Sequence, residues 1–255
     1  MFRIEEEVTR RDFFKKSWKH CLRWGILPCS FSILLKTVPS HAQKLGEILQ
    51  EARHYEKLSQ NRVKCHLCFR GCEILDGRRG FCRNRENIRG ILYSMVYAKP
   101  AALQIDPIEK EPSFHMIPGS KIFCTATASC NNRCKFCQNW HLSQRSVEEI
   151  PYVDLKPEEV VQKAIREHCE TVSFTYSEPT AFYEYMFDIV KIAKKSGLKT
   201  LVHTNGSMSS DPLLDLLKYM DGVTVDLKAF TEKFYNEISS SELEPVLHTL
   251  KTVKS

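Results

Sequence analysis

The chain has 255 residues, of which 42% are hydrophobic and 27% are charged. This balance is typical of one large folded domain, or of a domain with an appendage, and excludes a largely disordered chain. No apolar run reaches the roughly 18 residues that a membrane-spanning helix needs. The net charge is +6, but residues 1–42 carry eight Lys or Arg and four Asp or Glu, which leaves only +2 for the rest. The sequence therefore predicts no surface for nucleic acid.

Residues 1–42 have the layout of an export signal. The run TRRDFFK at residues 9–15 resembles the twin-arginine signal, an uncharged stretch follows at residues 24–35, and SHA at residues 40–42 ends with a small residue. This layout predicts export to the periplasm or cell exterior, with Cys21 and Cys29 inert. The alternative is a frayed or amphipathic N-terminal helix of a cytoplasmic protein.

Hydrophobic periodicity predicts alternating strands and helices after residue 113. A helix is expected earlier, over residues 44–58, followed by a strand at 91–96 and a proline-punctuated stretch of loop and short strand. The later strands are predicted at 122–126, 172–176, 200–202 and 222–225, and the later helices at 158–167, 182–193, 213–219 and 246–253. In the helix at 158–167, Val161, Ala164 and Ile165 are expected to face the core. Strand–helix repetition predicts parallel βα units.

Eleven cysteines are the most unusual feature of the composition. Because the number is odd, they cannot all pair as disulfides, and seven of them fall into two groups with the spacing of metal ligands. The stronger group is Cys130, Cys134 and Cys137, on the loop after the strand at 122–126. Three thiolates hold three irons of a cubane cluster and leave the fourth iron open for an exchangeable ligand. The alternatives are a zinc site completed by His141, or three buried thiols.

This spacing resembles that of the radical S-adenosylmethionine (SAM) superfamily. The resemblance implies a [4Fe-4S] cluster on Cys130, Cys134 and Cys137, whose open iron binds SAM and whose electron releases a 5′-deoxyadenosyl radical. It also implies a low-potential electron donor and a substrate from which hydrogen is abstracted; the substrate is unidentified, with a protein among the candidates. Phe136 is the aromatic residue that packs near the adenine in this family, although ordinary loop packing would also explain it.

Three longer runs resemble one branch of this superfamily, the AmmeMemoRadiSam system radical SAM enzymes, which are related to the pyruvate formate-lyase activating enzymes. These runs are KFCQNW at residues 135–140 with SQ at 143–144, FTYSEPT at 174–180, and DLKAF at 226–230; DPIEKEP at 106–112 also fits. The resemblance extends from about residue 50 to the end of the chain.

The resemblance assigns cofactor contacts to five further residues at the ends of predicted strands. Glu178 stands where the superfamily binds the SAM amino group, although it would also fit as an ordinary strand-end carboxylate. Thr204 and Asn205 are expected near the ribose or carboxylate of SAM. Asp226 and Lys228 are expected at the SAM and substrate end of the site, because the carboxyl ends of barrel strands hold the active site. A surface ion pair is the alternative for Lys228.

The second cysteine group, Cys65, Cys68, Cys72 and Cys82, precedes the core. Four thiols separated by glycine-containing turns can close around one metal centre. Four-cysteine coordination suits either zinc or an auxiliary iron–sulfur cluster, and the sequence does not separate them. Buried or redox-paired thiols are the remaining alternative.

The expected fold is α/β, a partial TIM-type (β/α) barrel of the radical SAM core with a small N-terminal Cys-rich region. The domains are predicted as a signal segment at 1–42, the Cys-rich region at 43–112 and an incomplete radical SAM core at 113–255. About four of the usual six βα units fit into the core, so the chain is expected to end early. A radical SAM enzyme is the main prediction; the alternatives are an inactive cluster-binding fragment, an activase of glycyl-radical enzymes and, from a different class, a zinc-stabilised nucleic-acid module.

Overall fold

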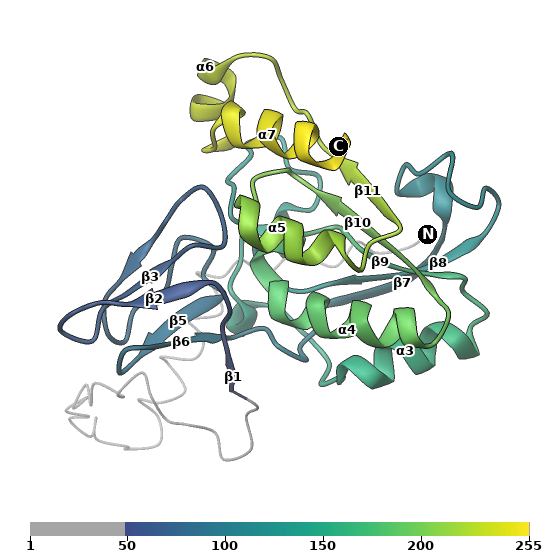
Figure 1. Cartoon of the computed structure of the whole chain (residues 1–255), viewed down its shortest axis with the longest axis horizontal. Coiled ribbons are helices and arrows are strands. Elements are labelled where there is room, and N and C mark those ends of the chain that lie inside the picture. Colours follow the sequence, from purple (N-terminus) through teal and green to yellow (C-terminus); the bar gives the residue numbers. More distant parts are fainter. Residues whose placement is uncertain (1–48, 255) are drawn as a thin grey trace, which may run out of the picture. The chain divides into compact units, whose positions relative to one another are not determined.

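The computed structural model describes residues 49–254 (Figure 1). The predicted export signal, Cys21 and Cys29 lie outside the described residues, as do residues 44–48 of the first predicted helix. Within residues 49–254, none of the helices has the length and apolar character required to cross a membrane.

The centre of the fold is a five-stranded sheet with the order β11-β10-β9-β8-β7. Strands β8, β9, β10 and β11 are mutually parallel, whereas β7 pairs antiparallel with β8. Every residue of β9 is buried, as expected for a parallel strand inside a layered fold. The strands are β7 (Ala102–Pro107), β8 (Lys121–Ala126), β9 (Thr171–Phe174), β10 (Lys199–Thr204) and β11 (Gly222–Val225).

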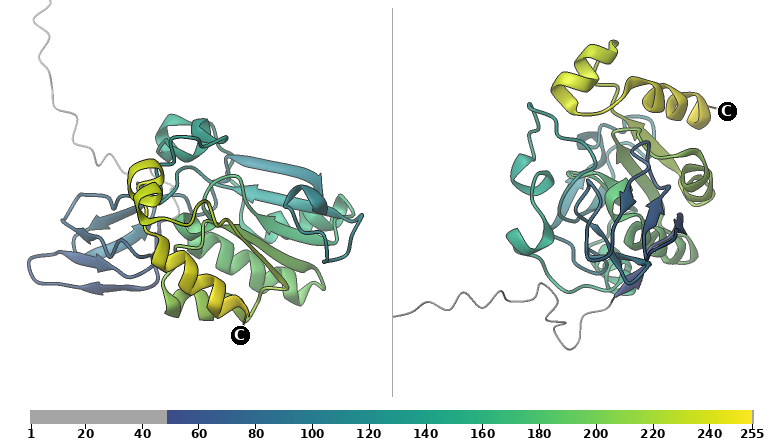
Figure 2. Two further views of the ribbon diagram at one scale, coloured as in Figure 1. Left: turned by 90° about the horizontal axis from the view of Figure 1, so that it is seen from above. Right: turned by 90° about the vertical axis from the view of Figure 1, so that its left-hand side faces the viewer.

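The helices that follow the parallel strands pack together on one face of this sheet (Figures 1 and 2). The apolar side chains of α3, α4 and α5 join those of β9 and β10 in one buried cluster. The helices are α2 (Trp140–Ser143), α3 (Pro157–Arg166), α4 (Tyr183–Lys195), α5 (Ser210–Leu217), α6 (Glu232–Phe234) and α7 (Leu243–Lys254), with short helical turns η1 (Ile108–Lys110), η2 (Val147–Glu149), η3 (Pro179–Phe182) and η4 (Tyr235–Ser239). The four parallel strands and the helices α3, α4, α5 and α7 confirm the βα alternation expected from the sequence.

Helix α3 begins where the local sequence predicts a helix to begin. Pro157 occupies its first turn, and the backbone N–H of Lys156 donates to a carboxylate oxygen of Glu159 at 2.7 Å, which caps the helix. Ala164 is fully buried as expected, but Ile165 is 47% exposed, so the prediction that Ile165 faces the core was wrong. The buried face runs through Val160 instead.

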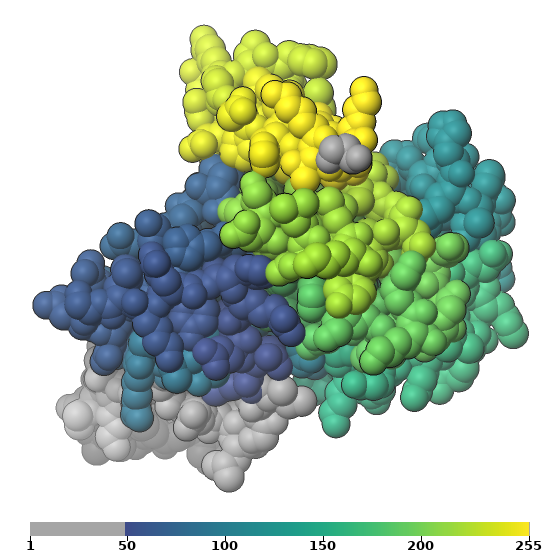
Figure 3. All heavy atoms as spheres, in the orientation of Figure 1, coloured from purple at the N-terminus to yellow at the C-terminus, as the bar shows by residue number. Residues whose placement is uncertain are grey.

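Helix α7 packs on the last strand and on α5. The backbone of α7 lies beside β11 and α5, and the Ser210 hydroxyl lies 2.9 Å from His248 Nε2. Figure 3 shows the atoms of α7 directly against those of α5. Val246 of α7 is fully buried and forms a small apolar cluster with Val225 of β11.

Two small antiparallel sheets precede the central sheet. Their strand orders are β1-β6-β5 and β2-β3-β4. The strands are β1 (Gln50–Glu51), β2 (Tyr55–Lys57), β3 (Val63–Cys65), β4 (Glu73–Ile74), β5 (Arg85–Ile88) and β6 (Ile91–Ser94). The strand predicted at 91–96 is therefore present as β6.

The helix predicted over residues 44–58 is wrong for its described part. Strands β1 and β2 occupy this stretch, and His54 between them has φ +55°, outside the right-handed helical region. The Ala52 N–H donates to the Leu92 carbonyl at 2.7 Å, so the backbone finds its partners in a distant strand rather than within a helix. Non-local pairing therefore overrides the weak helical pattern.

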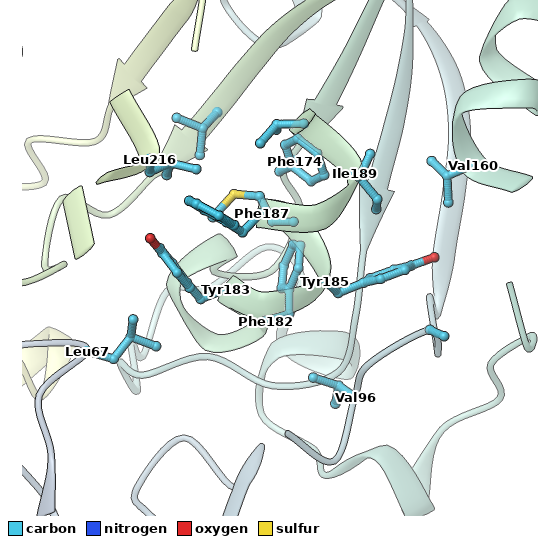
Figure 4. Close-up of a cluster of buried hydrophobic side chains, with 14 of the residues drawn as sticks. Leu67, Val96, Val160, Phe174, Phe182, Tyr183, Tyr185, Phe187, Ile189 and Leu216 are labelled. Carbon is cyan, nitrogen blue, oxygen red and sulfur yellow. The ribbon is translucent and has the colours of Figure 1, made fainter. Parts of the chain in front are cut away.

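The Cys-rich region and the central sheet share one hydrophobic core. Leu67 and Val96 belong to the same buried cluster as Phe174, Phe182 and Tyr183 (Figure 4). In addition, β7 joins the central sheet although it precedes residue 113. The domain boundary at 112/113 stays a prediction; the observed core runs across it.

Candidate active site

A cavity of about 410 Å³ opens where the parallel strands end. This volume is in the range of roughly 300–1,000 Å³ that is typical of ligand sites. Four segments contribute to its wall, and each directly follows one of the strands β8 to β11. The lining contains all nine residues that the sequence associates with the cluster and SAM: Cys130, Cys134, Phe136, Cys137, Glu178, Thr204, Asn205, Asp226 and Lys228.

The three cysteines of the motif enter the cavity from the loop after β8. The Asn132 N–H donates to Cys130 Sγ at 3.3 Å, and Cys137 Sγ lies 3.1 Å from the Ser143 hydroxyl. Burial and then the nearby Glu178 carboxylate raise the pKa of Cys130, and burial raises the pKa of Cys134. These two thiols are therefore protonated at neutral pH, and a bound metal would displace their protons.

The residues present fit a cluster with a polar co-ligand. In the described part of the chain, no group of three or more His, Cys, Asp or Glu side chains is arranged to hold a metal ion. The donor set nevertheless suits iron, because the three thiols share one wall and none of the nine described cysteines forms a disulfide. The same lining contains buried side-chain atoms of Asn132 and Ser177 that have no hydrogen-bond partner among residues 49–254. Buried polar atoms are normally paired, so these two side chains indicate a polar ligand.

The loop that carries the motif is held by contacts at Asn131 and Arg133. Asn131 donates to the Ser207 hydroxyl at 2.8 Å and accepts from Asn205 Nδ2 at 2.9 Å, which ties the loop to the end of β10. The Arg133 N–H donates to the Ser239 carbonyl at 2.9 Å, which ties it to η4. The position of the three thiols is thus set by β10 and η4 as well as by β8.

Aromatic and cationic side chains pack on the outer side of this loop. The guanidinium of Arg133 lies 4.4 Å from the ring centroid of Phe81, and that of Arg70 lies 3.5 Å from the same centroid. Arg70 also donates to the Asn131 carbonyl at 2.6 Å and to the Ser240 carbonyl. Phe81 therefore contacts two guanidinium groups that both support the loop.

Glu178 connects the ends of β9 and β10. One carboxylate oxygen accepts from the Thr180 N–H at 3.0 Å, the Thr180 hydroxyl at 2.6 Å and the Thr204 hydroxyl at 2.7 Å. The other oxygen accepts from the Asn205 N–H at 2.8 Å. The side chain is 3% exposed. Glu178 is therefore a rigid, buried carboxylate on the cavity wall, suited to face an ammonium group.

Asp226, Lys228 and His203 form a charged group on the β10–β11 side of the cavity. Asp226 accepts from Lys228 Nζ at 2.7 Å and lies 2.8 Å from His203 Nε2. Burial favours the neutral form of His203, but the hydrogen bond and charge of Asp226, together with Glu111 and Glu178, outweigh it and raise the pKa of His203. Burial opposes ionisation of Asp226 as well, yet His203 and Lys228 lower its pKa. Each partner therefore stabilises the charged form of the other.

Other predicted residues lie at the edge of the site or outside it. Phe136 is 52% exposed, with its ring 5.8 Å from that of Phe234. His141 is not among the residues that line the cavity, so the structure gives no support to the alternative zinc site. Cys65, Cys68, Cys72 and Cys82 line a second, smaller cavity.

The sequence did not assign several polar residues of the cavity wall, among them Asn132, Ser177 and His203. Each of them is adjacent or next but one to an assigned residue. Their positions could have identified them. Asn132 lies on the loop after β8, and Ser177 and His203 lie near the carboxyl ends of β9 and β10, where the site is expected.

Comparisons with known proteins agree with this geometry. The family model of the radical SAM superfamily matches residues 125–255. The uncharacterized protein MJ0808 of Methanocaldococcus jannaschii is 46% identical over 206 residues, which cover 81% of this chain and 61% of MJ0808. An S-adenosylmethionine-dependent nucleotide dehydratase of Lacinutrix mariniflava is 32% identical over 108 residues, which cover 41% of this chain and 22% of that protein. The chain thus spans less than two thirds of the length of these relatives.

Two solved structures are also similar. TYW1 with a lysine-pyruvate adduct bound matches with a TM-score of 0.36 and 24% identity, over 51% of each chain. QueE from Escherichia coli matches with a TM-score of 0.36 and 12% identity, over 62% of this chain and 75% of QueE. The family match, which covers the cysteine motif and all four strand ends that form the cavity, decides the assignment. The chain belongs to the radical SAM superfamily of enzymes.

Proposed function

We propose that the chain is a SAM-dependent radical enzyme that abstracts hydrogen from an unidentified substrate, with a protein among the candidates. Cys130, Cys134 and Cys137 would hold a [4Fe-4S] cluster. When bound and reduced by a low-potential donor, the cluster supplies the electron that cleaves SAM reductively to a 5′-deoxyadenosyl radical. The observation that carries the proposal is the lining of one cavity by these three cysteines and by the polar residues at the ends of β8 to β11.

The chain's own residues would bind and orient SAM. Glu178, fixed by four hydrogen bonds, presents a carboxylate to the amino group of SAM. Thr204 and Asn205 face its ribose or carboxylate, and Phe136 at the rim covers the adenine. Lys228, whose pKa is raised by Asp226 against the opposing effect of burial, stays charged and suits an anionic group of SAM or of the substrate.

We place the chain in the AmmeMemoRadiSam branch and interpret its four parallel strands as part of a TIM-type (β/α) barrel. The support is the motif-rich sequence at residues 106–112, 135–144, 174–180 and 226–230 and the strand order β8-β9-β10-β11. Activation of a glycyl-radical enzyme is the alternative within the same chemistry. An inactive cluster-binding fragment is the alternative outside it.

The test is anaerobic reconstitution of the full chain with iron and sulfide, followed by assay of 5′-deoxyadenosine after reduction with dithionite. We expect about four irons per chain, with 5′-deoxyadenosine formed from SAM. Cys134→Ala should lose both. Cys169→Ala is the matched control, because Cys169 is buried but lies outside the cavity lining, and it should keep both. A loaded cluster without SAM cleavage would favour the inactive fragment; absence of a cluster from the wild-type chain would refute the proposal.

We also propose that residues 1–42 direct export by the twin-arginine route, which carries folded proteins. The support is the sequence of residues 9–15 and the uncharged run after it. Fusion of residues 1–42 to a reporter that is active only outside the cytoplasm tests this. Replacement of Arg10 and Arg11 by Lys should abolish the signal, and equal reporter activity of both fusions would refute it.

A further inference from the structure

The second cysteine group forms a site of its own. Cys65, Cys68, Cys72 and Cys82 line a single cavity of about 20 Å³. They come from the turns around three different strands, because Cys65 ends β3, Cys72 precedes β4 and Cys82 precedes β5. All four are free thiols. Folding thus brings four thiols to one point without joining them as disulfides.

Tight turns produce this convergence. The Cys65 N–H donates to the Cys72 carbonyl at 2.9 Å, and the Gly71 N–H donates to the Cys68 carbonyl at 3.2 Å. Gly71 has φ +49°, a conformation that favours glycine. At Gly80, a Cβ would lie in ordinary contact with Cys72 Sγ at 3.8 Å and only 3.2 Å from Ile74 Cδ1, so the chain packs closely beside Ile74 at this wall of the cavity. The backbone is therefore shaped around the sulfur atoms.

A buried cation faces the same cavity. Arg85 is 1% exposed, lines the cavity and donates to Cys65 Sγ at 3.3 Å. It also pairs with Glu184, but its Nε is buried and has no hydrogen-bond partner within residues 49–254. A buried charge requires compensation and a buried N–H requires an acceptor. Glu184 compensates the charge, a thiolate beside Arg85 would supply the missing acceptor, and a bound metal would stabilise the thiolates.

We propose that Cys65, Cys68, Cys72 and Cys82 bind one structural zinc ion. The volume of the cavity favours zinc over a cluster, the two metal centres that suit four thiolates. A cavity of about 20 Å³ has room for roughly one atom-sized guest, which suits a single tetrahedral ion with sulfur ligands at about 2.3 Å. A cubane cluster adds four irons and four sulfides and would require the surrounding turns to open.

The thiols do not adopt closed ligand geometry as they stand, since the described side chains form no ready metal-holding group. The same is true of Cys130, Cys134 and Cys137, which carry the superfamily's cluster motif. Zinc binding requires the four thiols to turn inward and to lose their protons to solvent, with no change of oxidation state.

This site would support the loop that carries the radical SAM cysteines. Asn131, the neighbour of Cys130, lines the zinc cavity as well, and Arg70 between Cys68 and Cys72 donates to the Asn131 carbonyl at 2.6 Å. The Phe69 N–H donates to the Ser207 carbonyl at 3.2 Å, at the end of β10. Zinc would therefore fix the Cys-rich turns against both the cluster loop and the sheet.

The experiment measures zinc and iron separately, by elemental analysis of the full chain purified without added metal. We expect about one zinc per chain in the wild type and in Cys134→Ala, which loses only iron. Cys68→Ser and Cys82→Ser should each lose at least nine tenths of the zinc, whereas the control Cys169→Ala keeps it. Because zinc is counted independently of iron, failure of this proposal is distinguishable from failure of the proposed function.

A second measurement on the wild type keeps the test decisive if the serine variants do not fold. Replacement of zinc by cobalt should give the visible absorption and sulfur-to-metal charge transfer of a tetrahedral tetrathiolate. Three results would overturn the proposal: no zinc in the wild type, extra iron and sulfide retained by Cys134→Ala in place of zinc, or a cobalt spectrum without thiolate ligands.

Discussion

Substitution of Glu178 tests the buried carboxylate that joins the ends of β9 and β10. Glu178→Ala removes the acceptor of four hydrogen bonds, two of which come from the backbone N–H groups of Thr180 and Asn205. The hydroxyls of Thr180 and Thr204 can rotate toward other acceptors, but the two N–H groups cannot. Each unsatisfied buried N–H costs about 1–3 kcal/mol, which gives a total of about 2–6 kcal/mol. Since Glu178 also lines the cavity, water reaches this position, and we expect a loss of about 2–4 kcal/mol.

The matched variants separate the charge from the hydrogen bonds. Glu178→Gln keeps the oxygen that accepts from Thr180 and Thr204 but turns an NH₂ toward the Asn205 N–H, so it should lose about 1–3 kcal/mol. Glu158→Ala, on the exposed side of α3, is the control and should stay within about 0.5 kcal/mol of the wild type. The assay is urea denaturation of the full chain followed by circular dichroism. If Glu178→Ala were as stable as Glu158→Ala, the carboxylate would not hold the two strand ends together.

Three further predictions, one of them with a matched control variant, follow from the structure. His203→Gln should lose more stability at low pH than at high pH. Because the pKa of His203 is raised in the folded state, the stabilisation that His203 gives is fully present below about pH 6.5 and fades as the pH rises through the folded-state pKa. A decrease of the urea midpoint, relative to wild type, that is the same at pH 5.5 and pH 8.5 would contradict this. Gly206→Ala places a Cβ 2.8 Å from Val225 Cγ1 at φ +72° and should cost about 2–4 kcal/mol. Gly119→Ala, at φ +78° with nothing within 4 Å, should cost only about 1–2 kcal/mol, so equal costs would remove the packing argument. Arg70→Met should reduce iron retention after reconstitution severalfold, with wild-type retention as the refuting result.

Local signals predicted the elements whose neighbours are close in sequence. Strand β11 has the predicted bounds, and Pro157 marks the first turn of α3. The helix predicted around His54 was wrong because β1 pairs with β6, which lies far along the chain, and β2 forms a hairpin with β3; both pairings compete with a short helical pattern. The prediction that Ile165 faces the core was wrong because the width of the buried face of a helix depends on how far neighbouring elements cover the helix. Periodicity alone does not specify that coverage.

The residues of the candidate site also divide into those that local sequence could predict and those that it could not. The cysteine motif and the runs around Glu178 and Asp226 are contiguous in sequence, so a resemblance to a family can assign them. The charged pair of His203 and Asp226 depends on β10 and β11 lying side by side in a parallel register, with His203 opposite Thr224. No spacing within one segment encodes that contact.

The ring of Phe81, which contacts the guanidinium groups of both Arg70 and Arg133, links the two cysteine loops in a way that restricts how they can be recombined. Phe81 belongs to the segment of Cys82, Arg70 to that of Cys68 and Cys72, and Arg133 to the radical SAM motif itself. A chimera that imported only one of these loops from a relative lacking the aromatic residue would leave two guanidinium groups near Cys130 without the ring that they share. An exchange of these loops between relatives should therefore give a folded protein only when all three segments are exchanged together.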